Sequence, residues 1–310
     1  MAPSFGEGSR GQQRSLISRW LSSHRLISFC VLRGDLRRHR AWQEFRVDSR
    51  YDSLMCTLLV ASRVWPETPL LVAANRDERL DRASSPPALR EFGSRRVFAP
   101  LDLVAGGTWM GVNDLGLLVA ITNRFQPEGP SNPEGKLSRG LLVQRALSLA
   151  NARQAVDTIS TILASDYNGF HLVMADTSSA WIVWSDGREL SRNELRPGVH
   201  VVTERSFAAA PSYREEQLVL EAQRVGESQL PPMTALKESL RAHRAVAMDS
   251  TCVHLPELNY GTRSASVVRF DQAGPRSYHY APGPPCSEAF EDLSQGMLDG
   301  FRSGDQSVAR

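Results

Sequence analysis

The chain has 310 residues, a net charge of +2 and four cysteines. This length can bury a large core as one domain of roughly 250 residues with an extension. No apolar run approaches the ~18 residues of a membrane span, and the weak net charge gives no support for nucleic-acid binding. The cysteines are widely spaced and form no C-x-x-C pair. This spacing predicts a reducing compartment, without a disulfide framework, a zinc knuckle or another metal site.

Residues 1–54 differ in composition from the rest of the chain. They contain 10 arginines against 5 acidic residues, and their first part is also rich in serine. Two interpretations remain open: a disordered or misassigned extension, or an organellar targeting segment. We expect a cytoplasmic protein whose domain spans residues 55–300, followed by a flexible tail at 301–310.

A methionine–cysteine pair, Met55-Cys56, follows this extension. If translation starts at Met55, or the chain is cut there, removal of the methionine leaves Cys56 with a thiol and a free α-amine. The amine has a reference pKa of about 7.7–8.0, so near neutrality part of it could accept the thiol's proton. One residue would then supply both nucleophile and base. An internal Cys56 has no α-amine, and this chemistry is then impossible.

Two short apolar runs, residues 57–61 and 70–74, predict an antiparallel hairpin around a loop with two prolines. Such a hairpin sets Cys56 opposite Arg76, Asp77 or Glu78. An arginine there would favour the thiolate, and a carboxylate could orient the ammonium. The alternative is a surface hairpin that ends in a charged turn, with Cys56 an ordinary buried thiol.

The next segments carry prolines and then glycines. Residues 82–100 are charged and contain prolines, which predicts a loop. Residues 105–116 alternate glycine with bulky side chains, and a strand is predicted at 117–122. Because a strand rather than a helix follows, the glycines indicate tight turns and close backbone approach rather than a phosphate loop.

The remainder alternates helices and strands. Ser138 is predicted to cap a helix that runs to Leu149, and a second helix is expected at 151–163. The further predicted elements are strands at 170–175, 180–184 and 199–203, helices at 213–225 and 234–245, and strands at 266–270 and 277–280. Sheets at both ends with helices between them predict two packed sheets covered by helices.

Seven motifs occur in an order that resembles the NRDE family, which includes the Transport and Golgi organization 2 homologue of animals. They are Met55-Cys56, Asn75-Arg76-Asp77-Glu78, and residues 106–111, 118–123, 138–140, 167–170 and 260–264. In such relatives the methionine–cysteine pair stands at the start of the protein, which favours Met55 as the true start here.

The NRDE family is itself similar to the N-terminal-nucleophile hydrolases, especially the cysteine amidases that cleave penicillin V or conjugated bile salts. The similarity implies an α+β fold, a four-layer αββα sandwich of two mostly antiparallel sheets, with no cofactor. It implies that Cys56 is nucleophile and base, and that Arg76 and Asp77 hold the thiolate and the ammonium. It further implies an oxyanion donor at Asn123 and an arginine facing the nucleophile at Arg263. We expect substrate contacts from Asn75, Glu78, Trp109 and Thr203.

One position departs from these amidases and from most of the family. Where they have a second asparagine, this chain has Thr203-Glu204. Losing one oxyanion donor costs about 10²–10³ in rate, and a carboxylate facing the site would repel the developing charge. Either Thr203 or a backbone amide substitutes, or efficient acyl transfer is not the task of this protein.

Two classes of function therefore stay open. The first is a cysteine amidohydrolase of small acylated amides. The second is a non-catalytic role in Golgi organization, secretion, lipid or acyl-CoA homeostasis or haem trafficking, which the resemblance to the animal homologue implies. Haem could then be cargo, although histidines beside strands are more often structural. Its candidate ligands are Cys56, His171, His200, Cys252 and His254.

Overall fold

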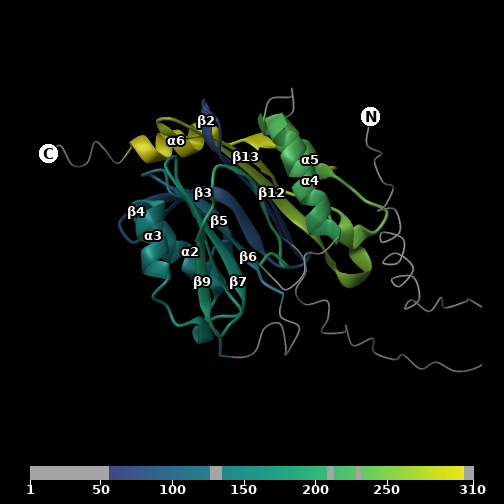
Figure 1. The fold of residues 1–310 in the computed structure, drawn as a ribbon, viewed down its shortest axis with the longest axis horizontal. Coiled ribbons are helices and arrows are strands. Elements are labelled where there is room, and N and C mark those ends of the chain that lie inside the picture. Colours follow the sequence, from purple (N-terminus) through teal and green to yellow (C-terminus); the bar gives the residue numbers. More distant parts are fainter. Residues whose placement is uncertain (1–55, 126–134, 208–212, 228–231, 304–310) are drawn as a thin grey trace, which may run out of the picture. The chain divides into compact units, whose positions relative to one another are not determined.

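The computed structural model describes residues 56–125, 135–207, 213–227 and 232–303. The predicted extension, residues 1–54, lies outside these ranges, and so do Met55 and residues 304–310 of the predicted tail. The strands within them form two antiparallel sheets of seven strands each (Figure 1). None of the helices in the described ranges combines the length and the apolar character that crossing a bilayer requires.

The first sheet has the strand order β10-β1-β2-β12-β13-β14, and β11 pairs with β12 outside this path. Its central hairpin is the one predicted from the two apolar runs, because β1 pairs antiparallel with β2. The strands of this sheet are β1 (Thr57–Trp65), β2 (Thr68–Arg79), β10 (Gly198–Val202), β11 (His254–Leu255), β12 (Tyr260–Asp271), β13 (Gly274–Ala281) and β14 (Glu291–Asp292).

The second sheet follows the chain, with the order β3-β4-β5-β6-β7-β8-β9. Its hairpin of β7 and β8 turns at Asp176, whose carboxylate accepts hydrogen bonds from the amides of Ser178 and Ser179. The strands of this sheet are β3 (Ser84–Phe92), β4 (Arg95–Asp102), β5 (Met110–Asn113), β6 (Leu118–Asn123), β7 (Phe170–Ala175), β8 (Ala180–Ser185) and β9 (Leu190–Glu194).

Three hydrophobic cores define four layers. Alternate residues of β1 face opposite ways: Leu58 and Val60 enter the core between the sheets, and Leu59 and Ala61 enter a core under a helix. Because both faces of the strand are covered, its sequence is a continuous apolar run and not an alternating pattern. The outer layers are α2 (Arg139–Leu147) and α3 (Ala152–Ile159) on the second sheet, and α4 (Tyr213–Glu227) and α5 (Pro232–Arg241) on the first.

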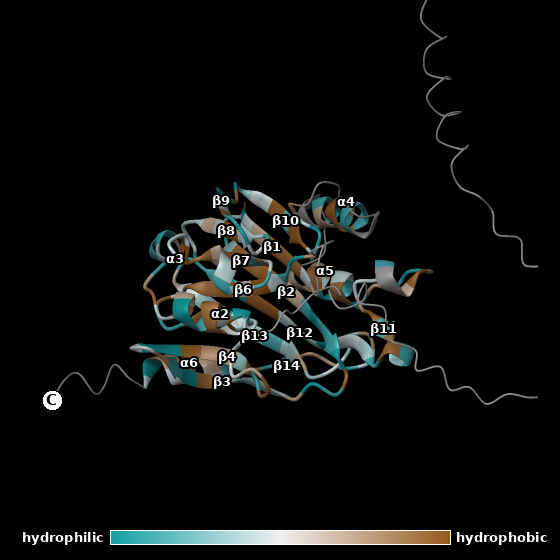
Figure 2. Ribbon diagram, turned by 90° about the horizontal axis from the view of Figure 1, so that it is seen from below, coloured by the Kyte–Doolittle hydropathy of each residue, from teal (hydrophilic) through white to brown (hydrophobic). Residues whose placement is uncertain are grey.

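The layers confirm the predicted αββα sandwich. In Figure 2 the hydrophobic residues follow the strands, whereas the helices carry hydrophilic residues on their outer sides. A last helix, α6 (Ser294–Arg302), packs against β13, β3 and β4 through the buried side chain of Met297. This arrangement buries apolar side chains of both sheets. Each Å² of apolar surface removed from water stabilises the fold by about 25 cal/mol.

The predicted loop at residues 82–100 is wrong, because this segment forms β3 and most of β4. The prolines misled the prediction. Pro86 and Pro87 occupy the edge strand of the second sheet, where the pairing of β3 with β4 is irregular between Ser85 and Ala88. An edge strand tolerates proline, since one side of it needs no amide donor.

Candidate active site

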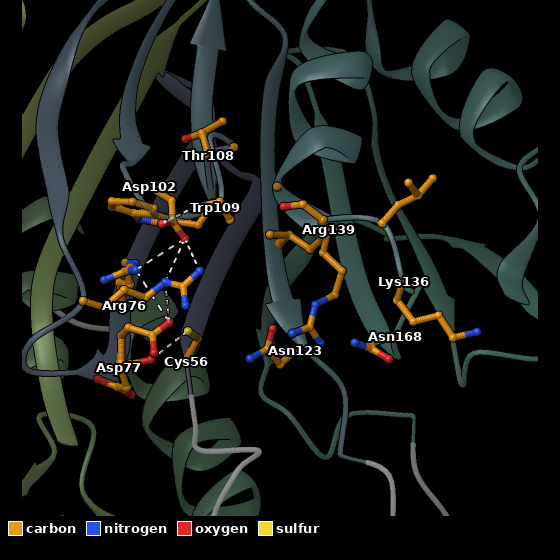
Figure 3. A pocket seen from close by; sticks show the side chains of 18 residues that line it. Cys56, Arg76, Asp77, Asp102, Thr108, Trp109, Asn123, Lys136, Arg139 and Asn168 are labelled. Carbon is orange, nitrogen blue, oxygen red and sulfur yellow. Dashed lines mark hydrogen bonds and ion pairs between the residues drawn. The ribbon is translucent and has the colours of Figure 1, made fainter. Parts of the chain in front are cut away.

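One pocket, of about 510 Å³, opens where the ends of strands from both sheets meet (Figure 3). The first sheet supplies residues around Cys56 and the end of β2, and the second supplies the ends of β4 and β6. The first turn of α2 closes one side. The lining side chains labelled in Figure 3 are Cys56, Arg76, Asp77, Asp102, Thr108, Trp109, Asn123, Lys136, Arg139 and Asn168.

Cys56 lies immediately before β1, in the wall of this pocket. Thr57 pairs with Asn75, so one step back along the same register places Cys56 opposite Arg76, one of the three positions that the predicted hairpin allowed. The thiol donates a weak hydrogen bond to the carbonyl oxygen of Asp77, with an Sγ–O distance of 3.7 Å. Burial, and after it the charge of Asp77, raises the pKa of this thiol to about 12, although Arg76 acts to lower it. Within the uncut chain the sulfur is therefore a thiol at neutral pH.

Arg76 is the central cation of the pocket and is only 5% exposed. Its guanidinium carbon lies 4.4 Å from the centre of the Trp109 ring, a cation–π contact. The Nη2 atom of Arg76 lies 3.6 Å from a carboxylate oxygen of Glu78 and 4.0 Å from one of Asp102. Its Nη1 atom is buried without a hydrogen-bond partner among the described residues, so the pocket holds an unused donor.

Asp102 anchors a second arginine at the pocket. Its Oδ2 accepts from Nε of Arg82 at 2.9 Å, and its Oδ1 accepts from the amides of Val104 and Ala105. Burial acts to raise the pKa of Asp102, but these hydrogen bonds outweigh it and lower the pKa. The ion pair and hydrogen bond with Asp102 hold Arg82 in place at the polar rim of the pocket.

Asp77 is held from behind by β12. The hydroxyl of Thr262 donates to Oδ1 of Asp77 at 2.5 Å, and the same hydroxyl accepts from the amide of Val253 at 2.8 Å. The pairing of β2 with β12 shifts between Thr262 and Ser264, which leaves Arg263 as an extra residue. Such a β-bulge re-aims the extra side chain.

Two glycines let α2 approach the pocket. A Cβ on Gly107 would lie 2.6 Å from backbone atoms of Gly140, and a Cβ on Gly140 would lie 2.9 Å from Cα of Gly107. This contact brings Arg139 into the pocket wall, where its Nη1 donates to the carbonyl oxygen of Gly169 at 3.0 Å. Burial lowers the pKa of Arg139 to about 10, so it stays charged at neutral pH. The Cβ distances at Gly107 and Gly140 leave no room for a side chain, which agrees with the predicted role of glycine in close backbone approach.

Six of the predicted site residues line the pocket together: Cys56, Arg76, Asp77, Glu78, Trp109 and Asn123. Three do not. Asn75 points away from it and is 1% exposed, because its Nδ2 donates to the carbonyl oxygens of Leu240 and Thr251. Thr203 builds a turn, in which its hydroxyl accepts from the amide of Arg205. Neither of these two predicted substrate contacts is among the residues that line the pocket.

Arg263 and Glu204 also lie off the pocket lining. Nη2 of Arg263 donates to the carbonyl oxygen of Arg82 at 3.4 Å, so it supports the pocket from outside. Glu204 is buried and lies 3.8 Å from the guanidinium of Arg205. Its carboxylate is not among the groups that line the pocket, which removes the electrostatic objection raised by this position.

Sequence reasoning missed several lining residues. They come from segments far from Cys56 in the chain and include Arg82, Asp102, Lys136, Arg139 and Asn168. Only Arg139 and Asn168 belong to the seven motifs, and neither had been assigned a role. Arg82 lay in the segment predicted to be a loop, and Asp102 follows that segment directly. Because strand β4 was not predicted, no strand end was there to place Asp102.

The candidate haem ligands do not meet at one site: Cys252 and His254 lie beside each other, 3.5 Å apart between Sγ and Nε2, but neither lines the pocket that holds Cys56. His171 is fully buried on β7, where Nε2 lies 2.6 Å from the carbonyl oxygen of Ser206 and Nδ1 lies 3.1 Å from Oγ1 of Thr122. Because a carbonyl only accepts, Nε2 carries the proton and Nδ1 accepts from the hydroxyl. Both ring nitrogens are occupied, so His171 is not a haem ligand. No histidine is among the described residues that line the pocket.

The fold and the pocket together define a class of protein: an αββα sandwich with a cysteine at the start of a central strand, in a pocket that both sheets line. The chain belongs to the Transport and Golgi organisation 2 family, whose model matches residues 55–280. This match confirms the family resemblance predicted from the seven motifs.

Two curated relatives show the extent of the match. The Transport and Golgi organization protein 2 homolog of Bos taurus is 29% identical over 241 residues, which are 66% of this chain and 83% of that protein. The homolog of Homo sapiens is 36% identical over 121 residues, which are 36% of this chain and 40% of that protein.

Solved structures with a similar fold include two amidases. One is the N-acylethanolamine-hydrolyzing acid amidase ortholog of Caenorhabditis elegans, at 13% identity and a TM-score of 0.48, covering 68% of this chain and 92% of that one. The other is a penicillin V acylase from Agrobacterium tumefaciens, at 18% identity and a TM-score of 0.43, covering 73% and 83%. Likeness at this level assigns no substrate to this chain.

Proposed function

We propose that the protein is a cysteine amidohydrolase that cleaves small acylated amides with Cys56 as its N-terminal nucleophile. The observation that carries the proposal is the position of the Cys56 sulfur, in the wall of a 510 Å³ pocket, opposite Arg76 and 3.7 Å from the carbonyl oxygen of Asp77. The proposal requires a form of the protein that begins at Cys56, produced by initiation at Met55 or by cleavage.

The chemistry follows from a free α-amine on Cys56. The amine takes the thiol proton, and the sulfur attacks the amide carbonyl carbon to form a C–S bond and an oxyanion. Collapse of this intermediate breaks the C–N bond, and the leaving amine takes the proton from the α-ammonium. Water then attacks the thioester and gives its proton to the α-amine. The carboxylic acid leaves, and the ammonium returns its proton to the thiolate.

The pocket supplies the groups that these steps need. Arg76, 5% exposed and with an unused Nη1 donor, favours the thiolate. The carboxylate of Asp77, held by Thr262, would orient the α-ammonium. Asn123, at the end of β6, offers an amide donor to the oxyanion from the opposite sheet. In this proposal the substrate lies between the two sheets, with its carbonyl carbon at Cys56 and its carbonyl oxygen toward Asn123.

The test uses purified protein that begins at Cys56, checked by intact mass, and a panel of acyl amides of increasing chain length. We expect turnover from this form, none from Cys56→Ala, and none from the uncut 310-residue chain. Asn123→Ala should lower kcat about 10²–10³-fold, the usual effect of losing one oxyanion donor. Asn193→Ala, an exposed asparagine on β9, is the matched control and should keep full activity.

Turnover that survives Cys56→Ala would refute the nucleophile. A haem titration of the same preparation addresses the non-catalytic alternative. A haem absorption shift together with no turnover on any amide would favour the carrier over the hydrolase.

A further inference from the structure

A second cluster of reactive side chains lies outside the active-site pocket. It consists of His243, Cys252, His254 and Cys286, one ligand-type atom from each, all within 4.8 Å of one another. None of these residues lines the pocket. We propose that these four residues bind one Zn²⁺ ion in a tetrahedral Cys₂His₂ site.

The distances fit such an ion. Zinc with ligands at about 2.0–2.3 Å in a tetrahedron holds those atoms about 3.3–3.8 Å apart. Sγ of Cys252 lies 3.5 Å from Nε2 of His254 and 3.6 Å from Sγ of Cys286. Nε2 of His254 lies 3.3 Å from Sγ of Cys286. The fourth ligand, His243, has its ring centre 5.2 Å from that of His254.

The type and number of ligands also favour zinc. Two thiols and two imidazoles form one of the common closed structural sites, and soft sulfur with imidazole selects against Mg²⁺ and Ca²⁺. A disulfide between Cys252 and Cys286 would explain two of the four residues and leave the convergence of two imidazoles on the same sulfurs without a cause. A single metal ion explains all four.

The backbone around the cluster holds its ligands in place. The amide of Cys252 donates to the carbonyl oxygen of Ala242 at 3.1 Å, next to His243. Nε of Arg241 donates to the carbonyl oxygen of Pro285 at 2.9 Å, next to Cys286. Three segments therefore meet here: the end of α5, the chain leading into β11, and the connection from β13 to β14. An ion would join them.

This site was not predicted from the sequence, because no two of its ligands have the spacing of a common zinc-binding motif such as C-x-x-C. Cys252 and His254 are only two positions apart, and Cys252 lies in a bend just before β11, which begins at His254. The other two ligands come from segments that the fold, not the spacing, brings close. The prediction of no metal site rested on motif spacing alone.

The experiment measures metal in the intact 310-residue chain, produced without a polyhistidine tag or added chelator. We expect about one zinc per chain by inductively coupled plasma mass spectrometry. Replacing the zinc with Co²⁺ should give the visible bands and the sulfur-to-metal charge-transfer absorption of a tetrahedral thiolate site. His254→Ala and Cys286→Ser should lose both signals, and because these side chains are exposed the chain should still fold.

His200→Ala is the matched control, since its Nε2 only contacts the carbonyl oxygen of Arg196, and it should keep one zinc. Circular dichroism of each variant establishes that it is folded. The proposal is overturned if the folded chain contains no zinc and gives no thiolate spectrum with Co²⁺. It is also overturned if the ligand variants keep their zinc, or if fresh protein contains a Cys252–Cys286 disulfide.

Discussion

Burial decides the protonation of individual side chains in this protein. It raises the pKa of the Cys56 thiol to about 12 and lowers the pKa of His171 to about 4. Both groups are therefore neutral at pH 7 unless a partner supplies the opposite charge. For Cys56 that partner has to include a proton acceptor beside the sulfur, because the coulombic effect of Arg76 is smaller than that of burial.

The reactivity of Cys56 should depend on where the chain begins. In the uncut chain the thiolate fraction at pH 8 is so small that alkylation of Cys56 by iodoacetamide should be about 10³-fold slower than for an ordinary cysteine. Its rate should keep rising through pH 10. In the form that begins at Cys56, the adjacent amine should raise the rate near neutrality. Mass spectrometry of the labelled peptide over time measures both rates, and equal rates would contradict the proposed base.

His171 should make the fold sensitive to mild acid. Its folded pKa, about 4, lies below the 6.5 of the unfolded chain, so between these values the unfolded state binds more protons. Its contribution is complete above pH 6.5 and is lost as the pH falls toward 4, by about 3 kcal/mol in total.

This loss is measurable by urea unfolding at pH 7 and pH 4.5. His171→Gln should be less stable than the original chain at pH 7 but should lose less stability on acidification. His200→Gln is the control, because this partly buried ring contacts the carbonyl oxygen of Arg196 and not His171, and the loss due to His171 should persist. A pH dependence unchanged in His171→Gln would show that other groups cause it.

At the scale of elements, strand β2 serves two layers at once. Successive side chains of a strand point to opposite faces. Asn75 turns toward the helical layer and ties β2 to the carbonyl oxygens of Leu240 and Thr251, whereas Arg76 turns toward the pocket. One four-residue motif thus combines an architectural residue with site residues.

The approach of α2 to the pocket should fail if Gly140 gains a side chain. In Gly140→Ala the new Cβ would lie 2.9–3.1 Å from backbone atoms of Gly107 and Thr108, which cannot move independently. We expect a loss of about 1–3 kcal/mol in the free energy of unfolding, as for other overpacked sites. Gly296→Ala in α6 is the matched control. Nothing lies within 4 Å of its new Cβ, so helix propensity should leave stability unchanged or slightly raised.

Local patterns were enough to predict most elements. The strand at 170–175 and the hairpin after it follow from apolar runs broken by an Asp-led turn, and both are confirmed. The same local logic predicted that Cys56 lies opposite Arg76, Asp77 or Glu78, and the register places it opposite Arg76. Helix α2 is confirmed, although Ser138 makes no side-chain capping hydrogen bond.

What failed depended on tertiary structure. The side-chain direction of Asn75 follows from the strand's orientation between its layers, and the outward position of Arg263 follows from a bulge. Edge strand β3 was missed because its prolines are tolerated only at an edge, which the sequence does not identify. β9 was missed because its exposed polar residues carry no apolar pattern.

At the scale of the whole molecule, the described residues complete their own cores. Both sheets are covered on their outer faces by helices of the same part of the chain, and the two sheets cover each other. The active-site pocket needs both sheets, so its geometry depends on the packing between them.

Residues 1–54 should therefore contribute little to stability. We expect a chain of residues 55–303 to unfold at the same denaturant midpoint and with the same slope as the 310-residue chain. Urea unfolding followed by tryptophan fluorescence and by circular dichroism tests this expectation. A lower midpoint for the shorter chain would mean that the predicted extension belongs to the folded domain.

The prolines of β3 also affect whether a strand of another molecule can pair with the edge of the second sheet. Pro86 and Pro87 lack the amide hydrogen that an incoming strand would need as a donor, and they sit on an outermost strand of the second sheet. Sheet extension from one molecule into the next is therefore blocked at that margin. Proline on an outermost strand is one of the features by which sheet proteins avoid edge-to-edge aggregation.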